Sequence, residues 1–165
     1  MKKSLLLSHD EINLKLERIA WQILENHVHA KTIVLVGLID RGADVANKLK
    51  IILEKHTTTI IQLTTIHIDK KNPLKTPTQI HNPSILNDSN VILVDDVLNS
   101  GITMAAALKE VLNYTPKSVM TAVLANRDHN QFPIQANFVG LSLATTLKEH
   151  ILYEEIDGNM SVYLL

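Results

Sequence analysis

The chain has 165 residues, of which 45% are apolar and 20% are charged, and it carries a net charge of −1 with no cysteine. These totals fit one domain with an ordinary hydrophobic core, and they exclude disulfides and thiolate zinc sites. No apolar stretch reaches the roughly 18 residues that suggest a membrane-spanning helix, and the near-neutral charge gives no general attraction to nucleic acid. The lack of cysteine favours a reducing compartment, so we expect a cytoplasmic protein.

Helical and strand patterns alternate along the chain. The first half predicts, in order, a helix, a strand, a helix and a strand at residues 8–29, 32–38, 43–56 and 57–68. The second half predicts a strand, a helix and four further strands at residues 91–94, 102–113, 118–124, 138–140, 150–153 and 161–165. Strand–helix–strand order favours an α/β fold with a mainly parallel central sheet flanked by helices, in a single domain spanning residues 1–165.

Residues 69–90 interrupt this alternation. They contain three prolines among Asn, Lys and Thr residues, which indicates an irregular segment. Long loops in compact domains are often functional lids. We therefore expect this segment to be a flexible loop that forms a small hood over a site.

The clearest functional pattern is VILVDDVLNSGIT, residues 91–103. Asp95 and Asp96 follow a buried strand, where ligands bind in open α/β sheets. Ionised carboxylates only accept hydrogen bonds, so they suit sugar hydroxyls or a hydrated divalent cation. Ser100, Gly101 and Thr103 then lead into a helix whose N-terminus favours a phosphate. The pattern indicates a site for a ribose 5-phosphate, and the alternative is a solvated strand end with a helix cap.

Residues 91–103 resemble the signature that binds 5-phosphoribosyl pyrophosphate (PRPP) in type I phosphoribosyltransferases. VLVGLIDRGADVANKL (residues 34–49) and AVLANRDHNQFPIQANFVG (residues 122–140) are similar to segments of one subfamily, the bacterial pyrimidine-operon attenuators that are also uracil phosphoribosyltransferases. The resemblance covers most of residues 10–150, but it is poor over residues 69–90. It implies the type I phosphoribosyltransferase fold with a divergent hood.

The resemblance implies a role for each matching residue. Asp95 and Asp96 would hold the ribose diol and, through water, a Mg²⁺ ion, and with Arg41 they would be the catalytic residues. The residues expected to bind the 5-phosphate are Leu98, Asn99, Ser100, Gly101, Ile102 and Thr103. Those expected to bind pyrophosphate are Ile39, Asp40, Arg41, Gly42 and Lys70, and those expected to contact the base are Arg127, Phe138 and Val139.

Several positions depart from the family pattern. Ile39 and Asp40 stand where relatives often carry Lys, or Thr before Arg, so a negative charge would lie beside the pyrophosphate. Lys70 would replace an Arg without its bidentate fork. Simpler alternatives are a surface pair between Arg41 and Asp40 and, for Phe138, packing in the core.

By resemblance the protein would transfer ribose 5-phosphate from PRPP to a nucleobase, releasing pyrophosphate with the help of Mg²⁺. Asn99 stands where enzymes for hypoxanthine and guanine use Asp, which disfavours those bases and leaves uracil favoured. One alternative is a PRPP- or nucleotide-sensing regulator that binds a pyrimidine-operon RNA, with little or no transferase activity. A basic face for RNA would come from Lys2, Lys3, Lys15, Arg18, Lys48, Lys50 and Lys55, diluted by acids. Another is a degenerate family member that binds PRPP without turnover. Relatives are commonly dimers or larger, so we expect a homodimer or higher homo-oligomer.

Overall fold

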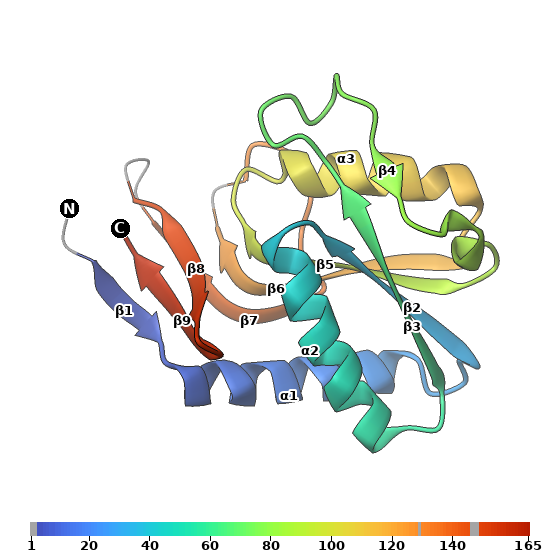
Figure 1. Cartoon of the computed structure of the whole chain (residues 1–165), viewed down its shortest axis with the longest axis horizontal. Helices are drawn as coiled ribbons and strands as arrows, with labels where there is room; N and C mark the ends of the chain where they lie inside the picture. Colours follow the sequence, from blue (N-terminus) through green and yellow to red (C-terminus); the bar gives the residue numbers. More distant parts are fainter. Residues whose placement is uncertain (1–2, 129, 146–148) are drawn as a thin grey trace.

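A six-stranded sheet forms the centre of the computed structural model, which describes residues 3–128, 130–145 and 149–165 (Figure 1). In spatial order its strands are β4 (Gln79–Ile80), β3 (Ile60–His67), β2 (Thr32–Leu38), β5 (Asn90–Leu98), β6 (Ser118–Arg127) and β7 (Phe138–Leu143). All neighbouring pairs are parallel except β3 and β4 at the edge. The predicted α/β class with a mainly parallel sheet is confirmed.

Helices cover both faces of this sheet. Helices α1 (His9–Asn26) and α2 (Arg41–His56) pack on one face, and α3 (Ile102–Val111) packs on the other (Figure 1). Two hydrophobic cores result, one on each side of the sheet. The middle strands β2 and β5 are almost entirely buried, as expected of apolar strands covered on both faces. Two short 3₁₀ helices, η1 (Pro83–Leu86) and η2 (Leu112–Tyr114), lie at chain turns.

The sheet has a point where the strand order reverses. β3 pairs with one edge of β2, and β5 pairs with the other edge. Pairing between β2 and β5 ends at Gly37 and Val94, whereas β5 remains paired with β6 as far as Leu98. The last part of β5 therefore has a neighbouring strand on one side only. This is the position at which open α/β sheets bind their ligands.

A separate three-stranded antiparallel sheet is built from the two ends of the chain, in the order β1-β9-β8 (Figure 1). Its strands are β1 (Ser4–Leu7), β9 (Asn159–Leu164) and β8 (Ile151–Ile156). Within residues 69–90, for which we expect a loop and hood, β4 pairs with the edge of β3 and η1 follows it. The sequence did not predict β1, because four residues form a strand only when a distant partner pairs with them.

Two element boundaries differ from the prediction in a way that affects the site. The strand predicted over residues 91–94 continues to Leu98, because its hydrogen bonds to β6 continue past the aspartates. Asp95 and Asp96 thus belong to the strand itself. The helix predicted from residue 43 begins at Arg41, which places that side chain in the first turn of α2.

Candidate active site

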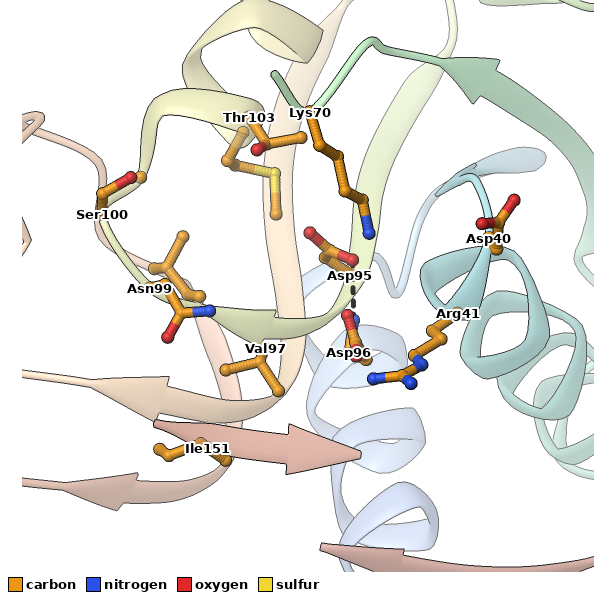
Figure 2. Close-up of a pocket in the computed structure, with 13 residues that line it drawn as sticks. Asp40, Arg41, Lys70, Asp95, Asp96, Val97, Asn99, Ser100, Thr103 and Ile151 are labelled. Atoms are coloured by element: carbon orange, nitrogen blue, oxygen red, sulfur yellow. Dashed lines mark hydrogen bonds between the residues drawn. The ribbon is translucent and has the colours of Figure 1, made fainter. Parts of the chain in front are cut away.

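A cavity of about 410 Å³ opens at the carboxyl ends of β2 and β5. Its walls come from the start of α2, from Lys70 after β3, from the end of β5 with the following turn into α3, and from Ile151 of β8 (Figure 2). Segments distant in sequence therefore meet at this one position. Most of the wall is polar, which suits a hydrophilic ligand.

Asp95 and Asp96 form the floor of this cavity, on consecutive residues of β5. Both are nearly buried, with 7% and 8% of their surface exposed. One carboxylate oxygen of Asp95, Oδ1, accepts a hydrogen bond from the backbone N–H of Asp96 at 2.9 Å (Figure 2). Burial, and next the negative charge of Asp96, raise the pKa of the Asp95 carboxyl well above its ordinary value. Two nearly buried acids side by side are costly to the fold, which indicates a functional reason for them.

Helix α2 approaches the floor so closely that Gly42 has no room for a side chain. A Cβ at this position would lie 2.7 Å from the carbonyl oxygen of Val94 and 2.8 Å from Oδ1 of Asp95. The absence of a side chain lets the first turn of α2 rest directly on β5. The positive end of the helix dipole is thereby brought to the cavity.

Two cations lie on the wall facing the aspartates. Arg41 extends from the first turn of α2 toward Asp96, and Lys70 hangs over Asp95 (Figure 2). Among the described residues neither side chain has an ion-pair partner, although Lys70 lowers the pKa of Asp95 by its charge. Asp40 also reaches the wall and precedes α2 as its N-cap residue, and the Ile39–Asp40 peptide bond is cis. Unpaired cations beside a helix N-terminus form a site for an anion.

The turn between β5 and α3 makes the opposite wall. Gly101 has φ +85°, a left-handed conformation that glycine adopts without strain. The carbonyl of Ser100 accepts hydrogen bonds from the backbone N–H groups of Gln131 and Phe132, both at 3.0 Å, which hold the turn in place. The first turn of α3 then presents backbone N–H groups toward the cavity, with the hydroxyls of Ser100 and Thr103 beside them.

A family model described as phosphoribosyl transferase domain matches residues 4–154. The chain belongs to this family. The class of enzyme expected from the sequence, a glycosyltransferase, follows from this membership.

Relatives and solved structures agree with this assignment. The bifunctional protein PyrR of Macrococcus caseolyticus is 32% identical over 173 residues, which cover 99% of this chain and 99% of the relative. Bifunctional protein PyrR of Alkaliphilus metalliredigens is 36% identical over 178 residues, covering 99% and 95%. The hypoxanthine phosphoribosyltransferase of Trypanosoma cruzi is 14% identical, with a TM-score of 0.80 over 96% of this chain and 95% of that one. This last likeness shows the fold alone, whereas the PyrR relatives confirm the predicted subfamily resemblance.

Most of the residues predicted for PRPP binding lie on the wall of one cavity in this phosphoribosyltransferase. These residues are Asp40, Arg41, Lys70, Asp95, Asp96, Leu98, Asn99, Ser100, Gly101 and Thr103. Ile39, Gly42 and Ile102 lie next to wall residues in the chain but do not line the cavity. Gly42 contributes indirectly, because its lack of a side chain lets α2 pack against Asp95.

The three residues predicted to contact the base lie elsewhere in the phosphoribosyltransferase. Phe138 is the first residue of β7 and is 3% exposed, in the core beneath α1. Phe138 is aligned through Ala122 with Val94, the residue before Asp95. The side chain of Phe138 packs in the core on the α1 side of the sheet and does not line the cavity. The carbonyl of Val139, expected to read the base, accepts a hydrogen bond from Arg18 at 2.9 Å. Arg127, at the end of β6, donates from Nε to the hydroxyl of Thr145 at 2.5 Å.

Three apolar wall residues were not predicted from the sequence: Val97, Met104 and Ile151. Val97 and Met104 adjoin the signature, and helical spacing after Gly101 is a signal that could have found Met104. No local pattern marks Ile151. It lies at the cavity because the fold brings β8, which is near the end of the chain, beside the end of β5 (Figure 2).

The donor set fits a magnesium ion that is held mainly by a substrate. Mg²⁺ is usually bound through one or two carboxylates, water and substrate phosphates, and Asp95 and Asp96 offer such carboxylates at the cavity floor. Across the described ranges no three acidic or histidine side chains are arranged to hold a metal by themselves. In the same part of the chain, no helix is long and apolar enough to cross a membrane.

Proposed function

We propose that this phosphoribosyltransferase transfers ribose 5-phosphate from PRPP to uracil and releases pyrophosphate. One observation carries the proposal: the adjacent carboxylates of Asp95 and Asp96 lie between a hydroxyl-lined helix N-terminus and the cations Arg41 and Lys70, in one cavity of about 410 Å³. PRPP has the same order of groups, because its ribose diol lies between a 5-phosphate and a pyrophosphate.

The turn into α3 would hold the 5-phosphate. Backbone N–H groups at the start of α3 and the hydroxyls of Ser100 and Thr103 are neutral donors that surround an anion without introducing a charge of their own. The Asp95 and Asp96 carboxylates would then accept hydrogen bonds from the ribose hydroxyls. Fixing the sugar at both points supplies the positioning on which this reaction depends.

Arg41 and Lys70 would stabilise the leaving group. During the reaction the bond between the anomeric carbon and a pyrophosphate oxygen breaks, and its electron pair leaves with pyrophosphate. A ring nitrogen of uracil forms the new bond to that carbon and gives up its proton. Cations fixed beside the departing oxygen stabilise the charge that develops there. Mg²⁺, held by Asp95 or Asp96 and by the substrate, would add further positive charge.

Uracil is favoured by the resemblance of the sequence to the uracil phosphoribosyltransferases and by Asn99, whose side chain lines the cavity. A neutral amide does not accept the purine ring proton as a carboxylate would. Val97 and Ile151 would provide an apolar surface for a flat base. The transferase is tested by measuring pyrophosphate release from PRPP and Mg²⁺ with uracil, orotate, hypoxanthine, guanine, xanthine and adenine in turn.

We expect release with uracil and none from the Asp95→Asn/Asp96→Asn double variant, with circular dichroism used to verify that this variant folds. If PRPP binds and no base gives release, the transferase proposal is wrong. The protein would then be a PRPP sensor or a degenerate family member. Pyrophosphate release with a purine and with no other base would support the transferase proposal but show that the acceptor is not uracil.

RNA binding is a second candidate function, because the relatives are bifunctional by name. The structure offers it little support. Several cations of the predicted basic face already have partners: Lys3 with Glu154, Lys48 with Glu155, Lys50 with Glu54, and Arg18 with main-chain carbonyls. Lys2 lies outside the described residues. A gel shift with a pyrimidine-operon leader RNA at low and high salt tests this function, and salt-sensitive binding would establish it.

We also expect a homodimer or higher homo-oligomer, on the resemblance to the family. Light scattering after size-exclusion chromatography measures the mass in solution directly. A monomer of 18.4 kDa at micromolar concentration would contradict this expectation.

A further inference from the structure

The inward face of β8 joins two regions of the site that are far apart in sequence. Alternate residues of a strand point to the same side, and in β8 these are Ile151, Tyr153 and Glu155. Ile151 lines the cavity of the site, and Tyr153 is 1% exposed in the core. Glu155 lies at the far end of this face and contacts α2.

Glu155 forms a hydrogen-bonded network with residues of both elements. Its carboxylate accepts a hydrogen bond from Nζ of Lys48 in α2 at 2.9 Å. It also accepts one from the hydroxyl of Tyr153 at 3.0 Å. The hydrogen bond from Lys48 lowers the pKa of Glu155, while burial raises the pKa of Tyr153. At neutral pH the tyrosine is therefore the donor and the glutamate a charged acceptor.

Arg41 lies on the same side of α2 as Lys48. The two are seven residues apart, nearly two helical turns, so their side chains share one face. A second cavity of about 240 Å³ lies on this face, and its lining includes Arg41, Tyr153 and Glu155. Arg41 thus borders both this space and the cavity of the site.

We propose that Tyr153, Glu155 and Lys48 are positioning residues that fix the small sheet against α2. This contact keeps the distance between Ile151 and Arg41 constant. Ile151 lies on the side of the cavity proposed for the base, and Arg41 lies on the side proposed for the pyrophosphate. The catalytic part of this inference rests on the proposed function, whereas the coupling between β8 and α2 does not. A part-exposed ion pair such as Lys48–Glu155 adds little to the stability of the protein. We therefore expect its loss to change the geometry of the site more than the free energy of unfolding.

The coupling is tested first without substrate. Hydrogen exchange is measured in peptides covering residues 41–52 and 151–156 of the wild type, Glu155→Gln and Tyr153→Phe. Glu54→Gln is the matched control, because Glu54 pairs with Lys50 on the same helix and lines neither cavity. We expect faster exchange in both peptides for the first two variants and no change for the control. Unchanged exchange in Glu155→Gln and Tyr153→Phe would overturn the proposal, and Tyr153→Phe keeps the ring should Glu155→Gln fail to fold.

Steady-state kinetics then test the catalytic consequence. We expect kcat/KM for PRPP to fall about tenfold in Glu155→Gln and about threefold in Tyr153→Phe, since small misplacements of positioning groups are costly. The charge-exchanged pair Lys48→Glu/Glu155→Lys should recover part of the loss. Faster exchange with unchanged kinetics would overturn the positioning role. A wild type that lacks turnover would refute the proposed function, while hydrogen exchange still decides the coupling.

Discussion

Two helices begin at the wall of the cavity, and their N-termini differ in charge. Helix α3 follows Gly101, and the side chains around its start are hydroxyls. Helix α2 follows Asp40, a carboxylate at the positive end of the helix that forms no capping hydrogen bond. The start of α3 is thus prepared for a bound anion, whereas the start of α2 already carries one. We therefore propose that an anion at the start of α2 would be held by Arg41 and Lys70, and that an anion at the start of α3 would be held by backbone N–H groups.

The largest expected effect comes from the acids between the two helices. Replacing both Asp95 and Asp96 by Asn should lower kcat/KM about a thousandfold, because two charged ligands of substrate and metal are lost together. Titration calorimetry with PRPP and Mg²⁺ should show weakened binding. A double variant with near-normal turnover would mean that neither carboxylate contacts the sugar.

The two glycines should respond differently to substitution. Gly42→Ala forces a Cβ against Val94 and Asp95 and should cost about 1–3 kcal/mol of unfolding free energy. Gly101→Ala meets its nearest atoms only at 3.4 Å, so its cost of about 1–2 kcal/mol comes from the left-handed backbone.

Substitution by asparagine distinguishes crowding at Gly42 from backbone strain at Gly101. Asparagine tolerates the left-handed region, so Gly101→Asn should be milder than Gly101→Ala, whereas Gly42→Asn should be at least as harmful as Gly42→Ala. Urea denaturation of the four variants measures the difference. An equal response at both positions would contradict the distinction between crowding at α2 and strain at α3.

Asp95 should also make stability depend on pH. Its folded-state pKa is raised, chiefly by burial and next by Asp96, so its contribution to stability is full below pH ~4 and is lost as the pH rises through that raised pKa. The amide side chain in the Asp95→Asn variant does not ionise. This variant should therefore be more stable than the wild type at pH 7, and its advantage should grow as the pH rises.

Thermal melts from pH 4 to pH 8 check this prediction, and the difference should shrink toward pH 4. Asp96→Asn offers a comparison at the adjacent residue, because it removes a negative charge that raises the pKa of Asp95. A constant difference between Asp95→Asn and wild type at every pH would show that ionisation is not the cause.

The smallest effect is expected at the start of α2. Asp40→Thr removes the negative charge beside the pyrophosphate position and should lower KM for PRPP about threefold, a size typical of exposed charge interactions. Asp10→Asn, at the first turn of α1, is the matched control and should leave KM unchanged. A higher KM in Asp40→Thr would show that Asp40 assists binding.

Local sequence determined the features whose interacting residues are close in the chain. The capping box at the start of α1 is an example: the backbone N–H of Ser8 donates to the carboxylate of Glu11, three residues later, at 2.8 Å. Asp95, Ser100 and Thr103 likewise line the same cavity, because one strand and its following turn carry them all. Apolar runs also predicted the central strands and the α/β class, since strands buried on both faces require such runs.

Tertiary structure decided everything that depends on partners distant in sequence. β1 exists because β9 pairs with it, and Ile151 reaches the cavity because β8 lies across the end of the sheet. Phe138 was expected at the base, but its side chain lies on the face of the sheet that packs beneath α1. Strand direction, sheet order and non-local pairing are settled only when the whole core packs, because each element buries its apolar face against residues far away in the chain.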